Sequence, residues 1–133
     1  MVNTHKNVRE QNCVPAECEA PAVIDILSLI GNKWSVLVVG ALSKGPMRYS
    51  QIFRKIDGVS QRMLTLTLKA LERDGLLTRT MFPTIPPRVD YALTKRGKSL
   101  IAPLSELWHW AQANRVAVEN DRRGYDRRSD DGG

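Results

Sequence analysis

Apolar side chains recur at helical spacing in several stretches of the chain. The clearest follows Ser60, where Leu64, Leu68 and Leu71 stand at i, i+4 and i+7, the spacing of one buried helix face. Ser60 is a favourable N-cap, and Gly75 accepts the left-handed conformation with which many helices end. The pattern therefore predicts an amphipathic helix that begins after Ser60 and ends just before Gly75.

Further elements follow from the same kind of pattern. Helical periodicity predicts four more helices, at 21–30, 34–42, 51–56 and 94–117. Pro21 suits the first turn of its helix, and Ser50 is expected to cap the short third one. Pro103 lies inside the last helix and removes one backbone hydrogen bond, so we expect a kink there.

Shorter apolar runs predict a small amount of β-structure. The stretches 76–82 and 89–93 are expected to form two hairpin strands joined through a PTIPPR tip, and 47–49 to form a short edge strand. The predicted fold class is therefore mainly α with a small β-hairpin wing. A polar-faced helix followed at once by a basic hairpin is the winged helix-turn-helix arrangement, in which the helix enters the major groove of DNA.

The 133 residues are enough for one domain. We interpret residues 1–20 as a flexible N-terminal arm, 21–118 as the domain and 119–133 as a disordered tail of mixed charge. The N-terminus has no apolar core of a secretory signal and the chain has no run of 18 apolar residues, so the expected location is cytoplasmic.

Positive charge is concentrated in one part of the chain. The formal net charge is +6, but residues 44–98 hold 12 Lys and Arg against 4 Asp and Glu, a net charge of +8. This segment contains the predicted helix-turn-helix and wing. A solvated basic surface would be the simplest interpretation of the charge alone, but its position on the motif favours a surface that faces phosphates.

Five blocks of sequence, in this order, resemble one known family: GNKW (31–34), GPMRYSQI (45–52), GVSQRMLT (58–65), LERDGLLTR (71–79) and PPRVDYALTKRGKSL (86–100). They are similar to the HxlR family of bacterial winged-helix transcription regulators, which is related to the MarR family. The resemblance runs from about Val23 to Trp110. It implies a DNA-binding transcription regulator, and it favours repression over activation.

The predicted DNA-binding residues lie on the recognition helix and at the base of the wing: Ser60, Gln61, Arg62, Thr65, Thr67, Lys69, Arg79 and Arg88. Arg62 is suited to guanine O6 and N7, and Lys69 to a backbone phosphate. Leu66 either meets a thymine methyl group or lies at the edge of the core. One of the wing arginines could instead pair with Asp90 or Glu72. Arg88 is the stronger DNA-contacting candidate of the two, because it matches the PPRV block of the family.

The last helix has an apolar stripe wider than a small core needs. We predict that it forms a homodimer interface, together with the first helix; the predicted interface residues are Leu104, Leu107, Trp108 and Ala111. Two-fold symmetry then implies a pseudo-palindromic operator.

Two cysteines raise the question of a regulatory signal, either an oxidant or electrophile or a small molecule. The resemblance implies a sensing cysteine just before the first helix, but that position is occupied by Pro21. Cys18 is the preferred redox-sensing candidate and Cys13 the second. Acidic neighbours of Cys18 oppose its reactivity, so the alternative is that both are ordinary arm cysteines.

Other functional classes receive less support from the sequence. No nucleotide-binding, metalloprotease or hydrolase motif is present, so we expect neither catalysis nor a cofactor. The two cysteines and the two histidines lack the spacing of a metal site. The remaining alternative is a protein-binding winged-helix module without DNA specificity.

Overall fold

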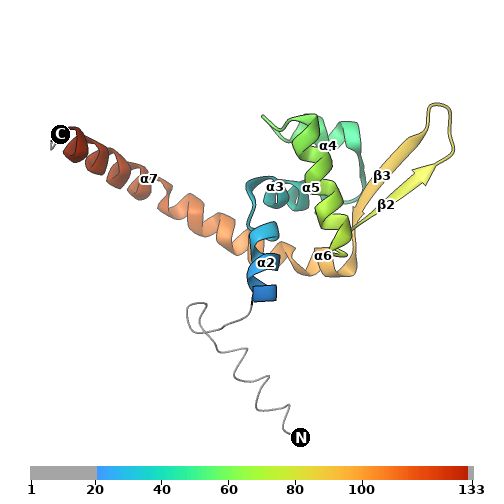
Figure 1. Ribbon diagram of the computed structural model, residues 1–133, viewed down its shortest axis with the longest axis horizontal. Coiled ribbons are helices and arrows are strands. Elements are labelled where there is room, and N and C mark those ends of the chain that lie inside the picture. The colour runs from blue at the N-terminus through green and yellow to red at the C-terminus, as the bar shows by residue number, and fades with distance from the viewer. Residues whose placement is uncertain (1–20, 132–133) are drawn as a thin grey trace, which may run out of the picture.

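The computed structural model describes residues 21–131, which form helices around one core and a small sheet (Figure 1). The helices are α2 (Pro21–Ile30), α3 (Lys33–Leu42), α4 (Tyr49–Lys55), α5 (Gln61–Arg73), α6 (Lys95–Ser99) and α7 (Ile101–Asp131). The strands are β1 (Met47–Arg48), β2 (Leu77–Phe82) and β3 (Arg88–Leu93). The predicted fold class, mainly α with a β-hairpin wing, is confirmed.

The three strands form one antiparallel sheet in the order β1-β3-β2. β2 and β3 pair from Leu77 opposite Leu93 to Phe82 opposite Arg88, and this hairpin is the wing. β1 pairs with the other side of β3. Leu77 and Leu93 are buried whereas Ile85 at the tip is fully exposed, so the base of the wing is fixed by the core and its tip lies in solvent.

The core is built around one face of α5. Leu64, Leu68 and Leu71 are 0%, 1% and 0% exposed, which confirms the predicted stripe. They lie in one apolar cluster with buried residues of α3, α4 and the sheet, namely Val38, Val39, Leu42, Ile52, Leu77, Tyr91 and Leu93. Burial of each leucine contributes about 1.5–3 kcal/mol to folding, so this face fixes the orientation of α5.

Both ends of α5 are capped as the sequence predicts. The Ser60 hydroxyl oxygen accepts a hydrogen bond from the Met63 N–H at 3.0 Å. Gly75 has a φ of 74°, and the Leu76 N–H donates to the Leu71 carbonyl at 2.9 Å. A residue with a Cβ atom would be strained at this φ, so glycine at this position lets the chain leave the helix and enter β2 directly.

The start of α4 differs from the prediction. The N-cap is Arg48 rather than Ser50, and Tyr49 is already helical. The cause is a side chain further along: the Gln51 amide oxygen accepts a hydrogen bond from the Arg48 N–H at 2.9 Å. This contact satisfies a backbone donor at the end of β1 and allows the helix to begin without a Ser50 cap.

The predicted helix at 94–117 is interrupted close to Pro103, as expected, but the structure places the interruption three residues earlier. The helical segment breaks at Leu100, between α6 and α7. Pro103 is therefore the third residue of α7, where backbone N–H groups have no partner within the helix. A proline in this position removes no helical hydrogen bond, which explains why α7 continues through it.

The C-terminal segment also differs from the prediction. Helix α7 extends to Asp131, so residues 119–131 are helical rather than a disordered tail. The mixed charges that suggested disorder place opposite signs three or four residues apart, as for Glu119 with Arg123 and Arg127 with Asp131. Such spacings stabilise a helix. The Arg123 guanidinium also donates a hydrogen bond to the Asn120 side chain.

Helices α2 and α7 extend away from the packed part of the molecule, and α7 leaves it on the side opposite the wing (Figure 1). Within residues 21–131, no single helix is long and apolar enough to cross a membrane. Helices α2 and α3 reach that length and composition only as a pair, bent by 66°.

Candidate nucleic-acid interface

Helices α4 and α5 and the turn between them form the helix-turn-helix. Tyr49, in the first turn of α4, joins the two helices: its hydroxyl donates a hydrogen bond to the Gln61 carbonyl at 3.0 Å. The same hydroxyl lies 3.2 Å from the Thr65 hydroxyl. The Tyr49 ring stacks on Phe53, with centroids 6.5 Å apart. Tyr49 thus positions the N-terminal turn of α5, a role that sequence reasoning missed because it depends on contacts between separate helices.

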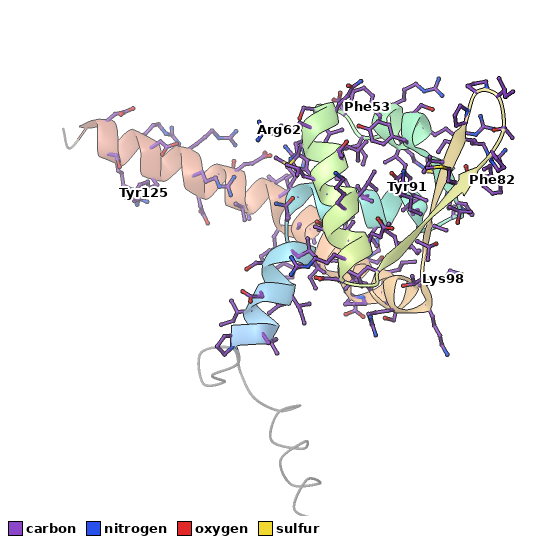
Figure 2. All side chains as sticks on the ribbon, turned by 45° about the vertical axis from the view of Figure 1, so that its right-hand side comes forward. Phe53, Arg62, Phe82, Tyr91, Lys98 and Tyr125 are labelled. Carbon is purple, nitrogen blue, oxygen red and sulfur yellow. The ribbon has the colours of Figure 1, made fainter. Side chains whose placement is uncertain are left out.

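The outer face of α5 carries most of the predicted base-contacting residues. Gln61, Arg62 and Lys69 are exposed, and Figure 2 shows Arg62 near the N-terminal end of α5, away from α6. Ser60 is exposed as the helix cap, and Thr65 is half-buried beside Tyr49. The structure therefore brings a guanidinium, an amide and an ammonium group to one accessible helix face.

Thr67 does not belong to this face. Its side chain is only 6% exposed, and its hydroxyl donates a hydrogen bond to the Met63 carbonyl at 2.8 Å. Thr67 lies three residues after Leu64 and four before Leu71, which places it on the buried stripe. Its predicted place on the exposed polar face was wrong because it was chosen by polarity rather than by helical position.

Leu66, rather than Thr67, lies on the exposed outer face of α5. It is 51% exposed and lies on the outer face, four residues after Arg62 and three before Lys69. Of the two alternatives for Leu66, the edge of the core is excluded. Met63, which sequence reasoning did not consider, is also exposed nearby. Its position in the first turn of α5, two residues after the start of the helix, could have indicated this from the sequence.

The two arginines of the wing are in different situations. The Arg88 Nε lies 3.3 Å from the Asp90 carboxylate, in an ion pair whose geometry is not that of a hydrogen bond. The Arg88 guanidinium also lies over the Phe82 ring, 4.3 Å from its centroid. Arg79 is exposed on β2 and forms no ion pair within residues 21–131. Arg79, and not Arg88 as the family resemblance suggested, is therefore the more available of the two for an anionic ligand.

The alternative in which one wing arginine pairs with Asp90 is thus realised by Arg88, although Asp90 follows it on the same strand rather than on the opposite one. The other basic side chains of the segment 44–98 are all exposed. The charge counted in the sequence is therefore present on the surface of the segment 44–98, mainly on α4, α5, α6 and the wing.

The predicted dimer-interface residues lie on an exposed part of α7. Leu107 and Trp108 are 58% and 50% exposed, and Ala111 is exposed, whereas Leu104 is half-buried against the core. Helix α2 has no buried residue, and its apolar side chains at positions 23, 24, 26 and 27 are all about half exposed. Within residues 21–131 these two helices leave their apolar faces uncovered.

Cys13 and Cys18, the candidate redox-sensing residues, lie outside the described residues, as does the predicted arm at 1–20.

Comparison with known proteins identifies the family. The HxlR-like helix-turn-helix family model matches residues 29–119. The uncharacterized HTH-type transcriptional regulator YtfH of Escherichia coli, strain K12, is 35% identical over 124 residues, which cover 91% of this chain and 96% of that protein. A solved structure of YtfH from Salmonella typhimurium has a TM-score of 0.71 and 37% identity, and the match covers 76% of this chain and 90% of that one.

A solved structure of diamide-treated YodB from B. subtilis has a TM-score of 0.61 and 32% identity, over 77% of this chain and 95% of that one. The family match spans the helix-turn-helix, the wing and most of α7. Together with the geometry of α4, α5 and the wing, these likenesses show that the chain belongs to the HxlR-like helix-turn-helix family of transcriptional regulators.

Proposed function

We propose that the protein binds a specific DNA operator as a homodimer and represses transcription from it. The observation that carries this proposal is the outer face of α5, where Gln61, Arg62 and Lys69 are exposed while the opposite face is buried in the core. A helix fixed in this way can enter a major groove as a rigid body. Its N-terminal turn would then meet base edges, as in other helix-turn-helix proteins.

Each side chain on this face has a distinct role in the proposal. Arg62 would donate two hydrogen bonds to guanine O6 and N7, and Gln61 would contact adenine N6 and N7. Leu66, exposed between Arg62 and Lys69, would contact a thymine methyl group. Lys69 would lie one or two turns away from the base contacts and neutralise a phosphate, which adds affinity without sequence preference.

The wing would contribute a further contact. Arg79 is the main candidate, because Arg88 is already paired with Asp90 and stacked on Phe82. Arg79 would contact a phosphate or the minor groove beside the recognition helix. Ser60 and Thr65 would act mainly on the position of α5, through the cap at Met63 and the contact with Tyr49.

The dimer is proposed from the uncovered apolar faces of α2 and α7. Leu107, Trp108 and Ala111 would pack against a second copy, with α2 alongside. Two recognition helices related by a two-fold axis would read half-sites of opposite orientation, with centres roughly 34 Å apart along the DNA.

The proposed test is selection of DNA from a random pool by the purified protein. An inverted repeat should be enriched. Arg62→Ala should cost about 1–3 kcal/mol of binding to that repeat and relax preference at one base pair, and Lys69→Ala should lower the slope of log affinity against log salt by about one unit. Arg128→Ala, near the end of α7, is the control and should leave affinity unchanged.

The same measurement separates this proposal from its alternative. If no sequence is enriched, and affinity for DNA is weak even at low salt, the domain would be a protein-binding winged helix instead. Unchanged operator affinity in Arg62→Ala would show that the proposed recognition face is wrong.

Redox control through Cys18 is a separate proposal. It is supported by the family and by the likeness to the YodB protein treated with diamide, a thiol oxidant. A disulfide between Cys18 and a partner cysteine would change the angle between the recognition helices. Operator affinity is to be measured before and after diamide for the parent and for Cys18→Ser. An equal loss of affinity in both proteins, or no loss in either, would exclude Cys18 as the sensor.

A further inference from the structure

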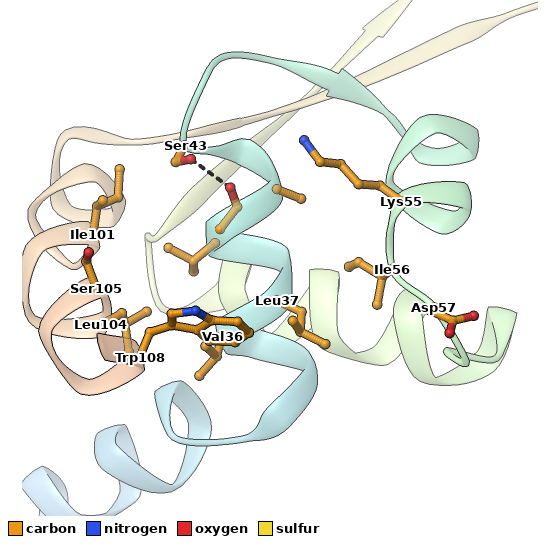
Figure 3. Close-up of a pocket in the computed structure, with 13 residues that line it drawn as sticks. Val36, Leu37, Ser43, Lys55, Ile56, Asp57, Ile101, Leu104, Ser105 and Trp108 are labelled. Carbon is orange, nitrogen blue, oxygen red and sulfur yellow. Dashed lines mark hydrogen bonds between the residues drawn. The ribbon is translucent and has the colours of Figure 1, made fainter. Parts of the chain in front are cut away.

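A cavity of about 580 Å³ lies beside α3, between the end of α4 and the start of α7 (Figure 3). The Trp108 indole reaches from α7 toward α3 and forms one edge of its opening. Trp108 is one of the residues proposed to pack against a second copy, so the cavity belongs to that contact. The wing projects on the side opposite α7, and its exposed apolar side chains are not explained by a contact through α7 (Figure 1).

The tip of the wing presents apolar side chains to solvent. Ile85 is 102% exposed, so its entire side chain is accessible, and Met81 near the end of β2 is 59% exposed. Thr84 and the prolines at 83, 86 and 87 surround Ile85 and carry no charge. Polar residues and glycine would suffice for a turn that is only solvated, whereas apolar surface is stabilised when it leaves water. The composition of this tip therefore indicates a contact.

Local hydrogen bonds hold the tip in one shape. The Thr84 N–H donates to the Phe82 carbonyl at 2.9 Å, and the Thr84 hydroxyl donates to the Pro86 carbonyl at 2.8 Å. The neighbouring proline rings fix their own φ angles. A tip held in this way keeps Ile85 in the solvent and loses little conformational entropy when it binds.

The strand register places a cation and an apolar side chain in sequence along one face of the wing. Leu77, Arg79 and Met81 alternate with the other residues of β2, and Leu77 is buried in the core. Tyr91 and Val89 of β3 continue this face opposite Arg79 and Met81. From the base of the wing to its tip, the face therefore changes from buried apolar to cationic to exposed apolar.

The charges beside the tip favour DNA over a protein as the partner. Arg79 precedes Met81 on the same face, and Arg88 begins β3 directly after the tip. The segment 44–98 as a whole has a net charge of +8, from 12 basic and 4 acidic residues. Such a surface attracts a polyanion, whereas an apolar tip that bound a groove on a protein would not need it.

The tip of the wing and the N-terminal turn of α5 reach the same side of the molecule. Both lie at the top in Figures 1 and 2, which differ by a turn about the vertical axis, whereas α6 lies at the lower end of α5. A duplex whose major groove receives the N-terminal turn of α5 would therefore also face the tip. The groove next to a major groove is a minor groove, about 6 Å wide, which admits an aliphatic side chain.

We propose that Ile85 is a wedge that enters the minor groove beside the recognised half-site, partly unstacks one base step and bends the DNA. Isoleucine is among the side chains that proteins insert in this way, with kinks of roughly 20–90°. Arg79 would neutralise a phosphate at the edge of the groove. Pyrimidine–purine steps such as T-A unstack most easily, so sequence preference at this step would arise without a hydrogen bond to a base. The wedge rests on the proposed function only in requiring that the protein binds DNA.

The test uses the full-length protein and two duplexes that contain 2-aminopurine, a base whose fluorescence rises when it unstacks. One duplex is the selected inverted repeat, with the probe placed at each flanking step in turn. The other has an unrelated sequence with the probe at a single T-A step, and it is bound at low salt, where charge alone gives affinity. The parent should raise the fluorescence severalfold at one step outside each half-site and at the T-A step. Energy transfer between dyes at the two ends of the repeat should show a bend.

Substitutions at the tip separate the wedge from binding in general. Ile85→Ala should abolish the fluorescence rise and the bend, but it should weaken binding by about tenfold at most, because the cost of unstacking offsets much of the gain from the contact. Ile85→Leu keeps an aliphatic wedge and should retain both signals. Val116→Ala, at a 59% exposed position of α7, is the control and should behave as the parent does. All three variants should keep the melting temperature of the parent, because neither side chain is buried.

Two results would overturn the wedge: bound parent protein without a fluorescence rise at any step, or an equal rise in Ile85→Ala and the parent. The second result would leave the tip to a protein partner. Failure of the proposed operator gives a different pattern. If no inverted repeat is selected, the unrelated duplex at low salt still decides whether Ile85 unstacks a base step. If the repeat is bound tightly but stays stacked and straight, the operator stands and the wedge is refuted. Absence of binding to either duplex would refute both.

Discussion

Helices α5 and α7 each carry a row of large apolar side chains, but they use it differently. On α5 the row is Leu64, Leu68 and Leu71, and it is almost completely inaccessible. On α7, Leu107 and Trp108 remain at least half exposed, and Trp110 is 61% exposed on another side of the helix. Apolar periodicity thus predicts a helix with a face to be buried, but not whether residues of the same chain cover that face.

The difference also separates two tasks within one small regulator. The covered row fixes α5 to the core, so the outer face with Arg62 and Lys69 is presented in one orientation. The uncovered row on α7 is available to a second copy, which would set the spacing between two such faces. We therefore expect mutations in the two rows to affect different properties.

The largest expected effect is on folding. Leu64→Ala should lower the free energy of unfolding by about 2–5 kcal/mol, because it leaves a cavity at a fully buried position. Leu107→Ala should change the stability of the monomer by less than about 0.5 kcal/mol, because its side chain is exposed. Urea denaturation at low protein concentration measures both values. Equal losses would contradict the distinction between the two rows.

Two glycines allow a similar comparison between a closely packed helix position and an open one. A Cβ atom on Gly97 of α6 would lie 2.0 Å from the Leu76 carbonyl oxygen, so Gly97→Ala should destabilise the fold by about 1–3 kcal/mol. Gly124→Ala should instead stabilise α7 by about 0.5–1 kcal/mol, because its position is open and alanine favours the helix. Thermal unfolding of the two variants should therefore shift in opposite directions, and a gain in stability for Gly97→Ala would refute the packing of α6 described above.

A smaller effect is expected at the junction of α4 and α5. Tyr49→Phe removes the hydroxyl that donates to the Gln61 carbonyl and approaches Thr65, so it should cost about 0.5–1.5 kcal/mol of stability. Operator affinity should fall as well, since the N-terminal turn of α5 loses a support. Tyr125→Phe, on the exposed part of α7, is the control. Identical behaviour of the two variants would mean that Tyr49 does not position α5.

Much of the helix-turn-helix could be predicted from the sequence because its signals are local. The Ser60 cap, the leucine spacing and Gly75 each depend on residues within one helix and its turns. The position of Thr67 was also available, since it is fixed by its distance from Leu64 and Leu71. It was missed because residue polarity was used in place of helical geometry.

Other features depended on contacts that no local pattern reveals. The Tyr49 hydroxyl meets a segment twelve residues away, and Arg88 is held by Asp90 and by Phe82 across the hairpin. The length of α7 was underestimated because alternating charges occur both in disordered tails and in exposed helices. The cavity beside α3 could not be foreseen, since three separate segments form its walls.

Recognition by α5 and assembly by α7 are tested most directly by measuring binding to the selected inverted repeat and to one isolated half-site, using Arg62→Ala and Leu107→Glu at nanomolar protein. We expect Arg62→Ala to weaken binding to both DNAs by about 1–3 kcal/mol, because it removes a base contact. We expect Leu107→Glu to weaken binding only to the full repeat, because it separates the two copies. Loss of half-site binding in Leu107→Glu, or undiminished binding to both DNAs in Arg62→Ala, would contradict the assignment of recognition to α5 and assembly to α7.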